Sequence, residues 1–127
     1  KPVKITDPVI LIRINQLYRH GMSAAELYDI TRGVWRLVFE RASAMKYVFA
    51  VYEGVVREVY EPEKWMPALT TKYPNRTDLV PHDANGRIEF VGKTAPEAIR
   101  QKYLLGDVTA YTKVSLQAPC LYINEDT

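Results

Sequence analysis

The chain is poor in residues that bind metals or form crosslinks. Its 127 residues include one cysteine, Cys120, and two histidines. One thiol cannot form a disulfide within the chain or build a cysteine-based metal site, which favours a reducing, cytoplasmic setting. No apolar run approaches the roughly 20 residues that cross a bilayer, and no secretory signal is visible. We therefore expect no metal, no cofactor and no membrane contact.

Catalytic signatures are also missing. Cys120 follows Pro119 at the start of an apolar run, a position typical of an inert buried thiol. Glu89 and Lys93 are too far apart to serve as the acidic and basic pair of a nuclease metal motif. No phosphate-binding loop or dinucleotide fingerprint is present. The sequence therefore predicts a binding module and not an enzyme.

Charge of either sign is not in large excess. The formal net charge is +2, and no long block of lysine or arginine occurs. This mild basicity permits an anionic partner without demanding one. If the partner is nucleic acid, phosphate contacts alone will not supply the affinity, and contacts to bases must contribute.

What the chain does contain is a central run that predicts two strands folded back on each other. Tyr47–Tyr52 is apolar or aromatic throughout and rich in side chains that suit a pleated sheet. Glu53 and Gly54 supply the turn, and Val55–Tyr60 is the return strand. Because Tyr47–Tyr52 is apolar on both faces, it should lie between two layers of protein. We expect Pro62 to end the return strand, because proline has no ladder donor.

The remaining elements predict one α+β domain of residues 1–127. Strands are predicted at 9–15, 87–91, 108–113 and 121–123, helices at 23–32 and 94–105, a short helical turn at 39–45, and an irregular loop at 70–85. Ser23 with Glu26, and Thr94 with Glu97, have the spacing of capping boxes. We expect a small, partly closed mixed β-barrel flanked by two helices, with residues 1–8 as a loose lead-in. The start at Lys-Pro favours a module of a larger protein.

Two tryptophans, Trp35 and Trp65, bracket the central hairpin. Large aromatic residues are commonly core residues, and that interpretation stays open for both. Both also stand beside cations, Arg36 and Lys64, at the ends of predicted elements. A tryptophan in that setting suits a pocket that stacks a flat ring and meets its polar edge.

The stretch from Ser23 to Pro67 carries a resemblance. It contains a helix followed by Arg32-Gly33-Val34-Trp35, a polar linker with Glu40-Arg41-Ala42, and an apolar strand ending at Tyr52 and Gly54. This arrangement resembles the YTH and EVE branch of the PUA-like superfamily. In YTH domains a Lys-Gly-Val-Trp segment supplies one wall of an aromatic cage for a methylated adenine, and a second tryptophan supplies another. The resemblance implies that Trp35 is the first wall and Trp65 the second.

Four further residues are candidates for contacts with a bound base. The guanidinium groups of Arg13 and Arg57 suit reading a polar edge, and each equally suits a structural ion pair. Backbone groups near Asn15 and the ring of Tyr52 complete the predicted base-binding set. The sequence does not decide between the structural and the ligand-binding roles of the two arginines.

Cations near Trp35 form a second predicted group. Arg19, Arg32, Arg36 and Arg41 lie in the first third of the chain, several of them close to the tryptophan. They form either a solvated surface or a rim of phosphate contacts round the pocket.

The sequence thus favours capture of a single base, unmodified or methylated, that is flipped out of DNA or presented by RNA. Such a module would accompany a fused or associated nuclease or ATPase, as in restriction or defence systems. Two alternatives stay open: a binder of a free nucleotide or nucleotide-derived signal, and a protein-interaction domain. Retention on nucleic acid that falls steeply with salt separates the first reading from the free-nucleotide one.

Overall fold

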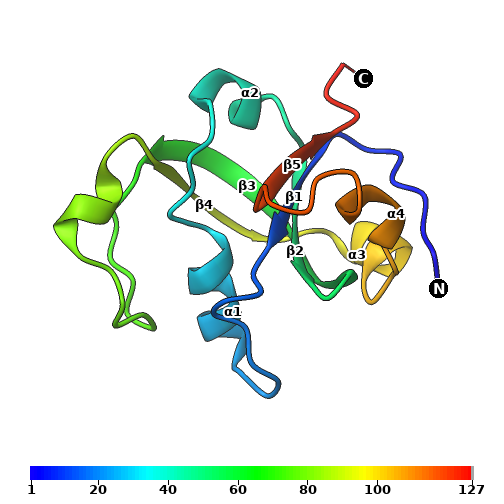
Figure 1. The fold of residues 1–127 in the computed structure, drawn as a ribbon, viewed down its shortest axis with the longest axis horizontal. Coiled ribbons are helices and arrows are strands. Elements are labelled where there is room, and N and C mark those ends of the chain that lie inside the picture. Colours follow the sequence, from blue (N-terminus) through cyan, green and yellow to red (C-terminus); the bar gives the residue numbers. More distant parts are fainter. Residues whose placement is uncertain (127) are drawn as a thin grey trace.

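The architecture is a five-stranded sheet with helices on both sides. The structure is a computed structural model that describes residues 1–126. Its strands are β1 (Val9–Arg13), β2 (Tyr47–Tyr52), β3 (Val55–Pro67), β4 (Ile88–Thr94) and β5 (Cys120–Ile123). Its helices are α1 (Ala24–Thr31), α2 (Phe39–Ser43), the 3-10 helix η1 (Pro81–Ala84), α3 (Glu97–Tyr103) and α4 (Thr109–Thr112). The strand order is β4-β3-β2-β1-β5; β1 and β2 run parallel, and the other neighbouring pairs are antiparallel (Figure 1).

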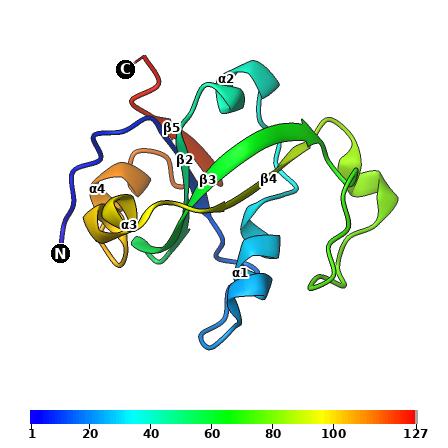
Figure 2. The ribbon, with the colours of Figure 1, turned by 180° about the vertical axis from the view of Figure 1, so that it is seen from behind.

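Apolar clusters fill both faces of the sheet. Side chains alternate along a strand, and in β2 Phe49 and Val51 join one cluster whereas Val48 and Ala50 join the other. Helices α3 and α4 contribute to the first cluster, and α1 and α2 contribute to the second. Figure 2 shows α3 and α4 lying together, apart from α1 and α2. The prediction that Tyr47–Tyr52 lies between two layers is therefore confirmed.

The α+β class is confirmed, and the mixed sheet of residues 1–126 is not closed into a barrel. Within residues 1–126, β4 and β5 form the two edges of the sheet and do not pair with each other. In the same described part of the chain, every helix is too short or too polar to span a membrane.

Strand β3 is longer than predicted. Glu53 (φ 50°) and Gly54 (φ 77°) form the expected turn, since both take the positive φ that a tight hairpin needs. The strand then continues to Pro67 instead of ending before Pro62, because its second half pairs with β4 from Tyr60 onward. The ladder to β2 has ended by that point, so the missing N–H of Pro62 leaves no β2 carbonyl without a donor.

The two predicted capping boxes have different outcomes. At the start of α1 the box forms: the Ser23 hydroxyl accepts from the Glu26 N–H at 3.1 Å, and the Glu26 carboxylate accepts from the Ser23 N–H at 2.8 Å. At the second position it does not form, because Thr94 is the last residue of β4 and α3 begins only after Pro96.

The predicted strand at 108–113 is a helical turn, α4. The carboxylate of Asp107 accepts a hydrogen bond from the Thr109 N–H at 2.8 Å, and the Thr112 hydroxyl donates to the Thr109 carbonyl at 3.3 Å. Side chains that bond locally to the backbone favour helix starts over sheet ladders. The prediction at 121–123 is confirmed by β5.

Residues 1–8 are tied to the rest of the domain and do not form a loose lead-in. The Val3 N–H donates to the Asp107 carbonyl at 3.0 Å. Ile5 is 3% exposed, and its N–H donates to the Tyr111 hydroxyl at 2.9 Å. The segment therefore belongs to the cluster that α3 and α4 cover.

Candidate functional site

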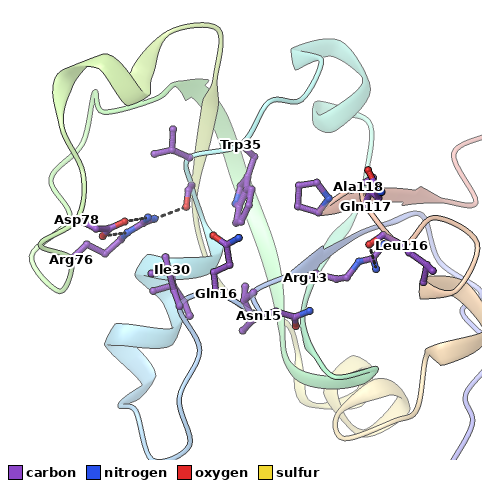
Figure 3. A pocket seen from close by; sticks show the side chains of 15 residues that line it. Arg13, Asn15, Gln16, Ile30, Trp35, Arg76, Asp78, Leu116, Gln117 and Ala118 are labelled. Atoms are coloured by element: carbon purple, nitrogen blue, oxygen red, sulfur yellow. Dashed lines mark hydrogen bonds and ion pairs between the residues drawn. The ribbon is translucent and has the colours of Figure 1, made fainter.

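A cavity of about 500 Å³ lies between the end of β1, the end of α1 and the segment that precedes β5. It is lined by Arg13, Ile14, Asn15, Gln16, Leu17, Ile30, Gly33, Val34, Trp35, Arg76, Asp78, Leu116, Gln117, Ala118 and Pro119. Figure 3 shows Trp35 projecting into this space, with Gln16 below its ring and the segment of Leu116 and Ala118 to one side. We call it the Trp35 cavity. Its volume is in the range of about 300–1,000 Å³ that is usual for small-ligand sites.

Trp35 is held in one orientation at the wall of this cavity. Its N–H donates to the Ile88 carbonyl at 3.0 Å, and its carbonyl accepts from the Ile88 N–H at 2.9 Å, which adds the segment to the edge of β4. Its indole N–H donates to the Thr31 carbonyl at 2.7 Å. Because the backbone and the polar edge of the indole are both occupied, the half-buried ring can offer the cavity an apolar face but no donor.

Gly33 permits the close packing that places Trp35. A Cβ at this position would overlap the Tyr73 hydroxyl and would come within 3.0 Å of the Glu89 Cβ. That hydroxyl donates to the Glu89 carboxylate at 2.9 Å, so it cannot move away without losing a bond. Any larger residue at this position would push the end of α1 away from β4.

Glu89 is the buried anchor of the loop between β3 and β4. Its side chain is fully buried and accepts from the N–H of Leu69 at 2.7 Å, from the N–H of Thr71 at 3.0 Å, and from the hydroxyls of Thr71 and Tyr73. A buried carboxylate is tolerated when its oxygens are satisfied in this way. Burial and the neighbouring Glu89 charge raise the pKa of Tyr73, which keeps its hydroxyl a donor.

Arg32 completes this buried network. It is 4% exposed and donates to Asp29 at 3.1 Å, to the Thr71 hydroxyl at 2.8 Å and to the Lys72 carbonyl at 2.6 Å. Its guanidinium carbon lies 3.9 Å from the centroid of the Tyr73 ring. The predicted phosphate contact of Arg32 is therefore wrong, because its charge is inside the protein and its donors are in use.

Arg76 and Asp78 bring the long loop to the wall of the Trp35 cavity. Arg76 donates to the Gly33 carbonyl at 2.7 Å and to both oxygens of Asp78, at 3.1 and 2.8 Å. The hydrogen bonds from Arg76 lower the pKa of the Asp78 carboxyl, so the two form a closed ion pair (Figure 3). This pair forms part of the cavity wall and contributes no net charge to it.

Arg13 lines the cavity and has donors to spare. Its Nη1 lies 3.4 Å from the Leu116 carbonyl, while Nε and Nη2 are buried without a hydrogen-bond partner in residues 1–126. A buried donor that lacks a partner costs about 1–3 kcal/mol. The predicted base-binding residues Arg13, Asn15 and Trp35 are thus brought to one cavity.

Trp65 is not the second wall of that cavity. It lies inside β3, is 5% exposed, and packs against Phe90 with ring centroids 5.0 Å apart. It borders a different, smaller hollow of about 210 Å³ beside Phe39 and Met45. The predicted slot between two indoles is therefore absent from the described part of the chain. The sequence prediction ended the strand before Pro62 and so did not include the pairing of β3 with β4. This pairing places the Trp65 side chain in the core.

Tyr52 and Arg57 do not line the Trp35 cavity. Tyr52 packs on Tyr18, with ring centroids 4.5 Å apart, and the Arg57 guanidinium carbon lies 5.6 Å from the Tyr52 centroid. The sequence placed both residues in the base-binding set, whereas neither of them is in the lining of the cavity.

The remaining arginines that were predicted to contact phosphate differ in whether they form ion pairs within the domain. Arg19 pairs with Glu26 at 2.7 Å. Arg41 forms two hydrogen bonds to Glu125 and stacks 4.0 Å from the centroid of the Tyr122 ring. Arg36 is exposed and makes no ion pair with any residue from 1 to 126. Of this group, only Arg36 is an unpaired cation next to Trp35.

Sequence reasoning missed part of the cavity lining. Gln16 and Gln117 contribute amides, and Arg76 and Asp78 contribute the closed ion pair. The unusual length of the 70–85 loop could have pointed to Arg76 and Asp78, since long loops in compact domains are often functional. No local pattern marks the two glutamines, which come from segments about a hundred residues apart in sequence.

The described lining of the Trp35 cavity contains no histidine and no cysteine. Burial raises the pKa of the Cys120 thiol to about 12, so it stays protonated. Across residues 1–126, no three histidine, cysteine or acidic side chains gather closely enough to hold a metal ion.

The chain matches no family model, no curated protein and no solved structure. The geometry of the Trp35 cavity therefore carries the functional proposal.

Proposed function

We propose that this domain captures a single nucleobase, presented by a nucleic-acid strand, in the Trp35 cavity. The observation that carries the proposal is an indole whose polar edge and backbone are already satisfied while its ring borders a cavity of about 500 Å³. A face of this kind has one strong use, which is stacking on another flat ring. In this proposal the domain is a PUA-like binding module and not an enzyme.

The polar groups of the lining suit the edge of a base. The amides of Asn15, Gln16 and Gln117 each offer both donors and acceptors, which is what an uncharged heterocycle with mixed functionality needs. Arg13 adds two unused donors, Nε and Nη2. Both atoms are covered, so an acceptor on the base reaches them only when a neighbouring side chain shifts. A base with a hydrogen-bond acceptor on its edge would satisfy these two donors and should therefore be preferred.

The charge of the lining favours a base over a free nucleotide. Arg76 is neutralised by Asp78, which leaves Arg13 as the cavity's one uncompensated cation among the described lining residues. A free mononucleotide carries a dianionic phosphate that needs several donors and positive groups. A base supplied by a strand leaves its phosphates outside the cavity, where Arg36 is exposed. A protein-interaction domain is less well supported, because Trp35 borders open space.

The test is binding of single-stranded DNA and RNA oligonucleotides of about six nucleotides, measured by fluorescence anisotropy. The set carries a central adenine, cytosine or guanine, each unmodified and methylated. We expect Trp35→Ala to weaken binding of the preferred oligonucleotide roughly 5- to 150-fold, the range for losing one stacked base. The preferred central base identifies the ligand.

Val38→Ala is the matched control, since Val38 is half exposed and lies outside the cavity lining. It should bind as the wild type does. The proposal fails if no oligonucleotide in the set binds, or if Trp35→Ala binds as tightly as Val38→Ala. Preference for mononucleotides over every oligonucleotide would favour the free-nucleotide alternative instead.

A further inference from the structure

A second cluster of aromatic and cationic side chains lies where the loop after β1 meets the β2–β3 hairpin. Tyr18 and Tyr52 have ring centroids 4.5 Å apart. The exposed ring of His20 meets both edge-on, at 5.4 Å from Tyr18 and 5.7 Å from Tyr52. Arg57 joins them from β3. We call these four residues the Arg57 cluster.

Arg57 is fixed in position yet unpaired. Its guanidinium carbon lies 5.5 Å from the centroid of Tyr18 and 5.6 Å from that of Tyr52, so the two rings support it. Its Nε is buried and has no hydrogen-bond partner within residues 1–126. No carboxylate in that described range pairs with it. A half-buried arginine normally pairs with an acid, because an uncompensated charge in that setting is costly.

Two other arginines of this domain, unlike Arg57, form ion pairs with carboxylates. Arg41 is held by Glu125, and Arg100 by Glu58 and Glu97. Each of these two charges is compensated within the domain. Arg57 has aromatic support without an anion, which is the arrangement expected of a group whose anion comes from a ligand.

The Arg57 cluster adjoins the Trp35 cavity through one short segment. Asn15, Gln16 and Leu17 line the cavity, and Tyr18 is the next residue along the chain. The Tyr18 N–H donates to the Ile14 carbonyl at 2.9 Å, which closes a tight turn between the two sites. This turn offers a short route along which a nucleic-acid strand with one base in the cavity can run toward the cluster.

We propose that the Arg57 cluster binds a backbone phosphate of the nucleic-acid strand whose base occupies the Trp35 cavity. Arg57 presents the planar donor fork that matches two oxygens of a phosphodiester, and Tyr18 and Tyr52 hold that fork in place. This inference rests on the proposed function. It adds that the ligand is a strand with phosphates and not an isolated base.

The experiment measures the salt dependence of oligonucleotide binding for wild type and variants. Each phosphate contact on a single strand contributes about −0.7 to the slope of log affinity against log salt. Arg57→Gln should make that slope shallower by about 0.7, and Arg57→Lys should restore most of it because it restores the charge. Lys4→Gln is the matched control and should keep the wild-type slope, because Lys4 is exposed, forms no ion pair within residues 1–126, and lies between Val3 and Ile5 on the opposite face of the sheet.

A second probe ties the effect to phosphate. It is the same oligonucleotide with uncharged methylphosphonate linkages on both sides of the central nucleotide. On this probe, Arg57→Gln and wild type should bind alike. The unfolding midpoints of all variants are recorded as well. If Arg57 had only a structural role, Arg57→Gln would lower the unfolding midpoint and leave the salt slope of binding unchanged.

The outcomes separate this inference from the function on which it rests. If Trp35→Ala weakens binding while Arg57→Gln leaves the slope unchanged, the phosphate site is wrong and base capture stands. If Arg57→Gln makes the slope shallower while Trp35→Ala has no effect, phosphate binding stands and base capture is wrong. Absence of binding by the wild-type domain overturns both.

Discussion

Trp65 and Phe90 are direct partners across the β3–β4 ladder, and their ring centroids lie 5.0 Å apart. Because Trp65 is 5% exposed, Trp65→Ala would leave a large cavity in the core and should lower the free energy of unfolding by about 3–5 kcal/mol. Trp35→Ala should cost less, since that ring is half-buried and borders open space. Urea denaturation of both variants checks the order; a larger loss for Trp35→Ala would contradict these assignments.

The buried carboxylate of Glu89 provides a second prediction. It accepts hydrogen bonds from Leu69, Thr71 and Tyr73, so Glu89→Gln turns an acceptor of several donors into a group that is itself half donor. Breaking a buried charged network in this way should cost about 3–5 kcal/mol of stability. Glu63→Gln, at an exposed position, is the control and should change stability by no more than about 0.5 kcal/mol. Equal effects of the two substitutions would show that the network is not anchoring the loop.

The capping box of α1 predicts a specific acid sensitivity. The hydrogen bond from the Ser23 N–H and the interaction with Arg19 lower the pKa of Glu26 from 4.5 to about 2. Because the pKa is lower in the folded state, the unfolded chain binds more protons in this window. The stability that the Glu26 carboxylate contributes is thus complete above pH 4.5 and is lost as pH falls toward 2.

Glu26→Gln keeps the hydrogen-bonding shape and removes the titration. The difference in urea midpoint between wild type and this variant should therefore be larger at about pH 6 than at about pH 3. A constant difference for Glu26→Gln would mean that its pKa is not lowered.

Cys120 should be an unreactive thiol in the folded protein. Burial raises its pKa to about 12, so almost no thiolate exists at about pH 8. A disulfide reagent should label the native protein far more slowly than free cysteine, and should label one thiol per chain after unfolding in urea. Rapid stoichiometric labelling of the native domain would contradict the assignment of an inert thiol.

Much of the fold follows from local patterns in the sequence. The hairpin of β2 and β3 was predictable because Tyr47–Tyr52 is continuously apolar and Glu53 with Gly54 suits the turn. The start of α1 was predictable because Ser23 and Glu26 satisfy each other across one turn. The errors arise where distant pairing or a local side-chain bond prevails. Pro62 is tolerated because β4 takes over the ladder, and Asp107 turns the next residues into a helix.

The candidate site was predictable only in part. Trp35 follows a helix and a glycine, and that local pattern correctly marks a ring at an element end. The role of Trp65 depends on its cross-strand partner Phe90, and the role of Arg32 depends on a loop some forty residues later in the chain. Such long-range contacts leave no periodic trace in the sequence. This is why one predicted wall borders a cavity and the other lies in the core.

Each tryptophan can be made the sole indole reporter of the domain. Trp65→Phe leaves Trp35 alone, and it loses no hydrogen bond because the Trp65 indole N–H has no partner in the described chain. Trp35→Phe leaves only the buried Trp65. The pair of variants therefore reports separately on the cavity wall and on the core.

The most direct test is the emission of Trp35 in the Trp65→Phe variant during titration with the preferred oligonucleotide. A base stacked on the indole should quench this emission saturably, with the same midpoint that anisotropy gives for binding. The emission of Trp65 in the Trp35→Phe variant should stay unchanged. Binding that leaves the Trp35 emission unaltered would contradict capture of a base against this ring.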